Sequence, residues 1–313
     1  MYTIARASQS EFVRIRTHQY HVRTWGQPQT GQPPLVMVHG WMDVGASFQF
    51  VVDALENTSL AGRHIIAPDW RGYGLTHHAN NPTKSCQGED TDNYWIPDYM
   101  ADLDFLLDHY SPGAPIDLLG HSLGGNVVMS YAGVRSERIR KLINLEGFGM
   151  AETKPAQAPT RYAQWFDQLK KFHQGELDMR AYPAISGVAA RLMKTNPRLS
   201  PDKADWLAQH WSAPNANGEF EILGDPAHKI VNANLARLEE TLVLYQRINM
   251  PLLAIEASDD SITGWYKGRY TLVDYHERLK QVPDVKIARI DEAGHMLHHD
   301  QPDKLAQLLA DFL

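Results

Sequence analysis

The chain has 313 residues, of which 43% are hydrophobic and 21% are charged, and its formal net charge is -7 at pH 7. This length is enough for one large or two small domains with a sizeable core. An acidic chain without a cluster of Lys and Arg lacks the surface that binds a phosphate backbone, so no nucleic-acid partner is expected.

Cysteine usage and the N-terminal residues bear on where the protein works. The single cysteine, Cys86, excludes an intrachain disulfide and fits a reducing compartment. Residues 1–6 lack the basic and apolar pattern of a signal peptide, and no stretch of the sequence is apolar for long enough to span a bilayer. We therefore expect a cytoplasmic protein without a membrane partner, and its oligomeric state is left open.

Hydrophobic periodicity predicts alternating strands and helices. Residues 11–16 and 19–25 alternate polar and apolar side chains, which predicts an antiparallel hairpin at the edge of a sheet. Short apolar runs predict buried strands, and amphipathic segments predict helices. In chain order these are strand 35–38, helix 46–56, strand 65–67, a helix opening at Pro97, strand 116–119, helix 126–132, strand 141–145, helix 235–247, strand 251–255, helix 266–280, strand 285–290 and helix 302–313.

Residues 76–95 are polar and irregular, and they include His77, His78 and Cys86. A pair of histidines and a distant cysteine could suggest a metal site. No second pair of ligands follows at the spacing typical of zinc sites. The segment is therefore predicted to be a solvated loop.

Between about residues 150 and 232 the alternation stops. Prolines recur, no sheet-like apolar strand is apparent, and the helical segments 161–172, 187–194 and 202–211 are rich in aromatic residues. We predict an α-helical cap at 148–235, inserted after the sixth strand of a core domain formed by 1–147 and 236–313. Most of the aromatic residues are expected to form the core of the cap, and a few are expected to line a pocket. The aromatic residues in question are Trp165, Phe166, Phe172, Tyr182, Trp206 and Trp211.

The central feature is the stretch Leu118-Leu119-Gly120-His121-Ser122-Leu123-Gly124-Gly125. An apolar strand leads into it and an apolar helix follows, so Ser122 is placed in a sharp turn between them. Glycines two residues before and two residues after the serine suit a strained turn with closely approaching backbone. Such a turn exposes the serine hydroxyl above the sheet as a candidate nucleophile.

The segment Gly120-His121-Ser122-Leu123-Gly124-Gly125 resembles the nucleophile elbow of the α/β-hydrolase superfamily. Three further motifs agree with that family in type and order, namely Val38-His39-Gly40-Trp41, Asp69-Trp70-Arg71-Gly72-Tyr73-Gly74 and Gly294-His295. The resemblance implies an α/β fold with a mostly parallel, doubly wound, eight-stranded sheet and an inserted helical cap. It implies no metal and no organic cofactor.

The resemblance also implies a catalytic triad in the chain order Ser, acid, His. Ser122 would be the nucleophile, and His295, on the loop after the last strand, would be the general base. The acid that orients the histidine is less determined. Asp260 follows strand 251–255, where the family most often carries the acid, and it is favoured over Glu146, which follows strand 141–145. Asp259 is a minor contender.

Other site residues follow from the same resemblance. The backbone N–H groups of Trp41 and Leu123 would form the oxyanion hole, the pair of donors that stabilises developing negative charge. Trp41, His121, Phe148 and Trp165 are candidates for substrate binding. His298, His299 and Asp300 could be mistaken for a metal cluster, and the interpretation as a polar loop is preferred.

A serine at the elbow favours acyl transfer to water. Dehalogenases and epoxide hydrolases of this fold carry an aspartate there, so Ser122 argues against both chemistries. The prediction is a carboxylesterase-like serine hydrolase for a small or medium hydrophobic ester or thioester substrate. A C–C bond hydrolase or a lactonase with the same triad remains an alternative, and so does a non-catalytic small-molecule binding protein on the same fold.

Overall fold

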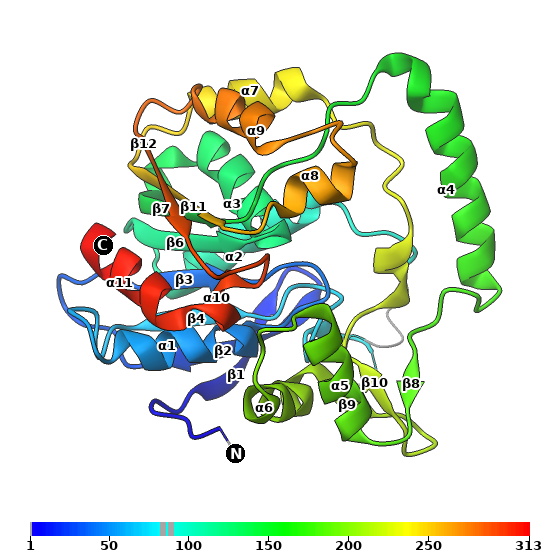
Figure 1. The fold of residues 1–313 in the computed structure, drawn as a ribbon, viewed down its shortest axis with the longest axis horizontal. Coiled ribbons are helices and arrows are strands. Elements are labelled where there is room, and N and C mark those ends of the chain that lie inside the picture. Colours follow the sequence, from blue (N-terminus) through cyan, green and yellow to red (C-terminus); the bar gives the residue numbers. More distant parts are fainter. Residues whose placement is uncertain (1, 82–85, 87–90) are drawn as a thin grey trace.

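The computed structural model describes residues 2–81, 86 and 91–313, and its centre is one large twisted sheet (Figure 1). Along this sheet the strand order is β1-β2-β4-β3-β6-β7-β11-β12, and the two-residue strand β5 pairs with β2 at the side of that path. The strands are β1 (Gln9–Ile15), β2 (His18–Trp25), β3 (Leu35–Val38), β4 (Ile65–Pro68), β5 (His77–His78), β6 (Ile116–His121), β7 (Ile139–Leu145), β11 (Leu252–Ala257) and β12 (Val285–Ile290).

The sheet is mostly parallel. The pairs β1–β2, β2–β4 and β2–β5 are antiparallel, and every pair from β4 through β3, β6, β7 and β11 to β12 is parallel. The predicted fold class is thus confirmed, with β5 as a ninth strand of the described sheet. This short strand lies in the segment that was predicted to be only a solvated loop, since His77 and His78 pair with Gln19 and His18.

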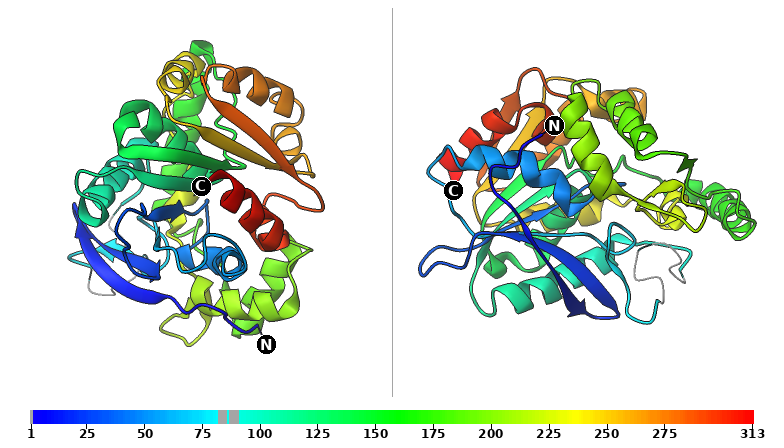
Figure 2. Two further views of the ribbon diagram at one scale, coloured as in Figure 1. Left: turned by 90° about the vertical axis from the view of Figure 1, so that its left-hand side faces the viewer. Right: turned by 90° about the horizontal axis from the view of Figure 1, so that it is seen from below.

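Helices cover both faces of the sheet. Successive side chains of a strand point to opposite faces, so strands that are apolar at every position make both faces apolar. Leu35 and Met37 belong to the apolar cluster that packs on α1 and α11, whereas Val36 and Val38 belong to the cluster that packs on α2, α3, α7 and α9. Helices can be seen on both sides of the sheet in Figure 2. These helices are α1 (Gln49–Leu55), α2 (Ile96–Tyr110), α3 (Leu123–Val134), α7 (Leu238–Gln246), α9 (Leu272–Leu279) and α11 (Pro302–Phe312).

The segment between β7 and α7 is mainly helical. It contains α4 (Ala158–His173), α5 (Ile185–Thr195) and α6 (Pro201–Trp211), as well as three short strands in the order β8-β10-β9. These strands, β8 (Ala181–Tyr182), β9 (Ser212–Pro214) and β10 (Phe220–Ile222), were not predicted from the sequence. The division into core and cap at 148–235 stays a prediction.

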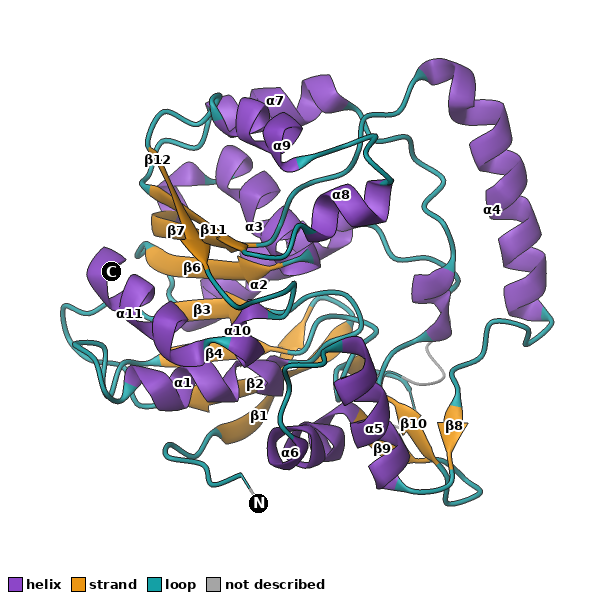
Figure 3. Ribbon diagram, in the orientation of Figure 1, coloured by secondary structure: helices purple, strands orange, loops and turns teal. Residues whose placement is uncertain are grey.

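The aromatic residues of this inserted segment fall into two groups. Tyr182, Trp206 and Trp211 are buried with α5 and α6 in a cluster of their own. In contrast, no residue of α4 is buried, and this helix lies at the periphery of the molecule (Figure 3). Trp165 and Phe166 therefore do not contribute to a cap core, contrary to what was expected of most of the aromatic residues.

The single helix predicted over 266–280 is wrong. The structure has α8 (Ser261–Tyr266) and α9, separated by a turn. Lys267 ends α8 in the left-handed region at φ 50°, and Thr271 begins α9 with a capping box in which Thr271 and Asp274 bond reciprocally. The C-terminal cap of α8 and the N-terminal cap of α9 thus divide the predicted helix into two. Trp265 belongs to α8, which follows β11 at the carboxyl edge of the sheet.

Within the described ranges, no helix is both long enough and apolar enough to cross a bilayer.

Candidate active site

Ser122 occupies a strained turn between β6 and α3. Its backbone angles are φ 52° and ψ -113°, a conformation that non-glycine residues rarely adopt. A Cβ at Gly120 would lie 2.4 Å from the carbonyl oxygen of Gly124, and a Cβ at Gly124 would lie 2.3 Å from that of Val38. The glycines predicted for a nucleophile elbow are therefore required by close backbone contact.

The turn brings Ser122 to His295. The Ser122 Oγ lies 2.9 Å from His295 Nε2, and the opposite ring nitrogen, Nδ1, lies 3.2 Å from Glu146 Oε2. Serine, imidazole and carboxylate thus form a continuous hydrogen-bonded chain. This is the geometry in which a base activates a nucleophile and a third group orients the base.

The acid beside the histidine is Glu146, and the preference for Asp260 is corrected. The Asp260 carboxylate accepts the backbone N–H of Thr263 at 2.9 Å and so caps α8. Asp259 pairs with Arg198 at 2.7 Å. Both aspartates are thus engaged in other contacts, while Glu146 projects from the end of β7 toward the histidine.

A hydrogen bond to its side chain and the turn that follows it fix the position of Glu146. Its Oε1 accepts the backbone N–H of Ala257 at 2.7 Å, and its own backbone has a positive φ of 53°. The following turn is fixed by Asn144, whose Oδ1 accepts the N–H of Gly147 and whose Nδ2 donates to the Gly147 carbonyl oxygen. Sequence analysis missed Asn144. The available signal was an amide residue within the buried run Leu142–Leu145 at the end of β7.

Burial sets the protonation of this pair. It raises the pKa of Glu146 to about 8, and the carboxylates of Glu256, Asp260 and Asp259 add to the effect. Burial also lowers the pKa of His295 to about 4. At neutral pH the favoured state therefore has a protonated Glu146 carboxyl and a neutral His295 imidazole.

The predicted oxyanion loop is tied to the sheet through His39. The ring Nε2 of this buried histidine accepts the backbone N–H of Trp70 at 2.9 Å, and its carbonyl oxygen accepts the indole N–H of Trp70 at 3.0 Å. Leu123 is the first residue of α3, so its N–H has no acceptor within the helix. Trp41 and Leu123 both line the pocket in front of Ser122.

The pocket at Ser122 has a volume of about 220 Å³. Of the four candidates for substrate binding, Trp41 and Phe148 line this pocket, and its described lining includes neither His121 nor Trp165. Trp165 lies on the peripheral α4, and His121 is buried behind the site with its Nε2 2.8 Å from the His295 carbonyl oxygen. The residues that line the pocket are Trp41, Ser122, Leu123, Asn126, Glu146, Phe148, Gly149, Met150, Trp265 and Tyr266.

Trp265 is a site residue that sequence analysis missed. Its ring packs edge-on against that of His295, with centroids 4.4 Å apart, and 53% of the residue is exposed. An exposed tryptophan against a candidate catalytic histidine forms an apolar wall that a ligand can contact. The incorrect helix prediction over 266–280 hid its position.

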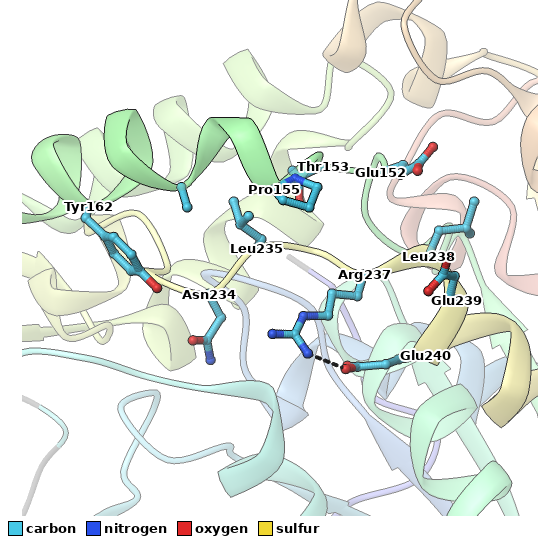
Figure 4. A pocket seen from close by; sticks show the side chains of 11 residues that line it. Glu152, Thr153, Pro155, Tyr162, Asn234, Leu235, Arg237, Leu238, Glu239 and Glu240 are labelled. Atoms are coloured by element: carbon cyan, nitrogen blue, oxygen red, sulfur yellow. Dashed lines mark hydrogen bonds and ion pairs between the residues drawn. The ribbon is translucent and has the colours of Figure 1, made fainter.

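A larger cleft of about 780 Å³ lies between the start of α4 and residues 234–240 (Figure 4). It is lined by Tyr162 and Leu235, and also by charged residues that include the ion pair Arg237–Glu240. Ser122 does not line this cleft. The site with the candidate chemistry is thus the smaller of the two pockets.

Comparison with known proteins agrees with this geometry. A family model described as alpha/beta hydrolase fold matches residues 33–302. The serine hydrolase-like protein of Danio rerio is 25% identical, with 99% of this chain and 90% of the relative covered. Epoxide hydrolase A of Mycobacterium tuberculosis is 23% identical, with 96% of each chain covered.

Solved structures share the fold. The thioesterase domain from the curacin biosynthetic pathway superposes with a TM-score of 0.79 at 22% identity, covering 97% of this chain and 99% of that domain. The names of these similar proteins indicate different hydrolase activities, among them epoxide hydrolase and thioesterase. Family membership alone leaves the substrate undetermined.

Proposed function

Because the chain belongs to the alpha/beta hydrolase family, we propose that it is a serine hydrolase that forms an acyl-enzyme on Ser122. Its substrate in this proposal is a small or medium hydrophobic carboxylic ester or thioester. The observation that carries the proposal is the hydrogen-bonded chain from Ser122 Oγ through His295 to Glu146, which opens into a pocket.

In the first half of the reaction, Ser122 Oγ attacks the carbonyl carbon and His295 Nε2 accepts the serine proton. The tetrahedral intermediate collapses when the imidazolium returns that proton to the leaving alcohol or thiol. Water then enters and attacks the acyl-enzyme while His295 Nε2 accepts one of its protons. The imidazolium returns this proton to Ser122 Oγ as the carboxylic acid leaves. The net reaction consumes one water and regenerates Ser122.

Glu146 is the triad acid in this mechanism. Its ionised carboxylate accepts the Nδ1 proton of His295, fixes the productive tautomer and stabilises the transient imidazolium. The contact of 3.2 Å between these groups supports that role. The backbone N–H groups of Trp41 and Leu123 are the proposed oxyanion donors, each contributing about 3 kcal/mol to stabilising the transition state.

The elbow residue favours this chemistry over epoxide opening, which one relative's name indicates. An alkyl-enzyme needs a carboxylate nucleophile, whereas the hydroxyl at position 122 is suited to acyl transfer. The pocket walls favour an apolar substrate, since Phe148, Met150 and Trp265 present hydrophobic surface beside Ser122. A volume of about 220 Å³ suits a short or medium acyl group.

Initial rates on p-nitrophenyl esters from acetate to decanoate, with thioesters alongside, test the proposal. The wild type is expected to turn over the shorter esters, and Ser122→Ala is expected to lose that activity. Activity that survives in Ser122→Ala would contradict the assigned nucleophile. Turnover only of a lactone or a diketone would favour the alternative bond types, and binding without turnover would favour a small-molecule binding protein.

A further inference from the structure

Three buried side chains from separate segments converge behind His295. Asp43 follows β3, His121 ends β6, and His298 lies on the short helix α10 (Leu297–Asp300). One ligand atom from each lies within 4.8 Å of the other two, and each residue is at most 2% exposed. Among the described residues, no hydrogen-bond partner exists for Asp43 Oδ2, His121 Nδ1 or His298 Nδ1.

The hydrogen bonds of His121 and Asp43 show which of their atoms have a lone pair available to bind a ligand. His121 Nε2 lies 2.8 Å from the carbonyl oxygen of His295. Because a carbonyl oxygen only accepts, Nε2 carries the proton, and Nδ1 presents a bare lone pair. Asp43 Oδ1 accepts the indole N–H of Trp211 at 3.1 Å and the N–H of Val44 at 2.8 Å. Its Oδ2 is left facing the histidines. The nearer nitrogen of His298 is Nε2, 3.8 Å from Asp43 Oδ2 and 3.4 Å from Ser47 Oγ.

Acceptors that face one another in a dry interior are unfavourable unless a donor or a cation joins them. We propose that Asp43, His121 and His298 form a buried binding site for one divalent transition metal ion, with Zn²⁺ as the best match. Two imidazoles and a carboxylate are a ligand set that Zn²⁺ takes, with a fourth position for water.

The groups around the three ligands fit the same assignment. Metal-bound histidines usually donate the opposite ring N–H to a carbonyl or carboxylate, and ligating carboxylates are themselves hydrogen-bonded. His121 and Asp43 both meet this condition through the contacts above. Burial lowers the pKa of His121 and His298, and it raises the pKa of Asp43 to about 7. The imidazoles are therefore in the neutral form that binds metal, and a metal ion would displace the proton of the Asp43 carboxyl.

The cluster is looser than a loaded site. His298 Nε2 lies 3.8 Å from Asp43 Oδ2, and ligand atoms around tetrahedral zinc lie about 3.4 Å apart, as bond lengths of about 2.1 Å require. Small side-chain shifts are therefore part of the proposal. The competing occupant is a buried water, which would donate to Asp43 Oδ2 and to His121 Nδ1.

The site was not apparent in the sequence, because its ligands come from three distant segments. The local group His298, His299 and Asp300 was predicted to be a polar loop. The structure instead buries His298 and His299 in α10, and His299 bonds Ser47 at 2.6 Å. The metal site does not depend on the proposed hydrolase activity, although His121 links it to the backbone of His295.

Metal content and thermal stability of the full chain test the proposal. Protein refolded with and without Zn²⁺ is freed of excess metal for elemental mass spectrometry, and its thermal unfolding is measured separately in the presence and absence of free Zn²⁺. The expected result is one Zn²⁺ per chain and a Tm raised by about 5 °C at about 100 times the Kd. Mg²⁺, which prefers oxygen ligands, is expected to give neither effect.

Asp43→Asn is the decisive variant. The amide keeps an oxygen for Trp211 and Val44 and places an NH₂ donor where Oδ2 faces the histidines, so the metal-free variant is expected to fold with at least the wild-type Tm. It is expected to lose the bound Zn²⁺ and the Tm rise. His109→Gln, at an exposed histidine of α2, is the matched control and is expected to keep both.

Equal Zn²⁺ content in the wild type and Asp43→Asn would overturn the proposal, since binding would then lie at surface histidines. Absence of zinc from the refolded wild type would overturn it in favour of the buried water. Co²⁺ provides an independent measurement, because a four-coordinate site gives intense visible absorption. Those bands are expected in the wild type and in His109→Gln, and not in Asp43→Asn.

Discussion

His295 Nδ1 lies 3.2 Å from Glu146 Oε2, and these two residues come from strand ends 149 positions apart in the sequence. The parallel order β7-β11-β12 brings the carboxyl ends of their strands to one edge of the sheet. The strand between them, β11, carries Asp259 and Asp260 just beyond its end, yet neither faces the histidine. The Glu146 side chain crosses the end of β11, where its Oε1 accepts the backbone N–H of Ala257.

Exchanging the two candidate acids for amides distinguishes their roles. Glu146→Gln is expected to lower kcat by roughly 10³-fold or more, because an amide does not stabilise the imidazolium. Asp260→Asn is the matched control and is expected to keep near-wild-type kcat, since asparagine also caps a helix. Steady-state rates on the best ester measure both. A larger loss in Asp260→Asn than in Glu146→Gln would reverse the assignment.

The pH profile follows from the Glu146–His295 pair. The productive state has an ionised Glu146 and an unprotonated His295 Nε2, so it holds one proton fewer than the resting pair. Burial raises the pKa of Glu146 to about 8, which means that the protonated, inactive form persists to that pH. The rate is therefore expected to rise with increasing pH through a limb near pH 8 in a plot of kcat/KM.

Glu146→Gln is also the control for this limb. Without a titrating carboxyl, the residual activity should follow His295 alone, whose pKa burial lowers to about 4. The limb is then expected to move to acid pH. A limb near pH 6.5 in both proteins would show that the imidazole titrates as in water and would contradict the role of burial.

Much of this site could be predicted from local sequence. The glycines around Ser122 and the Gly294-His295 pair after the last strand are short-range signals, and the structure brings Ser122 and His295 together. The acid could not be chosen in this way, because two parallel strands end in carboxylates and tertiary contacts decide which one faces the histidine. Trp265 was missed, and His298 was placed in a polar loop, for a similar reason. Their roles depend on turns and packing between distant segments.

Asn144 is expected to act as a positioning residue. Asn144→Ala removes both side-chain bonds to Gly147 and the bond to Tyr275, which frees the turn that presents Glu146. The free energy of unfolding should fall by about 2 kcal/mol, since buried partners lose their hydrogen bonds. At a temperature where the variant is folded, kcat is expected to fall while KM changes little. A purely structural role would leave the rise of kcat/KM near pH 8 in place, whereas a positioning role shifts the pH at which it occurs.

Trp265 is expected to contribute to substrate binding without taking part in proton transfer. Trp265→Ala removes the apolar wall beside His295, so KM for hydrophobic esters should rise by roughly tenfold or more, in line with about 1.5 to 3 kcal/mol for a buried aromatic contact. Acetate esters, which contact less of this wall, should be affected less than hexanoate esters. Trp265→Phe is the matched variant and is expected to retain most of the affinity. A uniform fall of kcat across the ester series would instead assign Trp265 to the support of His295.

Gly124 provides a prediction about the turn itself. A Cβ at this position would lie 2.3 Å from the carbonyl oxygen of Val38 and 2.6 Å from that of His39, and neither backbone atom can move without shifting β3. Gly124→Ala is therefore expected to lower the free energy of unfolding by roughly 3 kcal/mol or more, the cost of overpacking against rigid neighbours. Gly113→Ala is a glycine control with nothing within 4 Å of its Cβ, although its φ of 75° adds strain of about 1 kcal/mol. Denaturant unfolding measures both variants, and a Gly124→Ala protein as stable as Gly113→Ala would show that the contact between the elbow and β3 is looser than the structure has it.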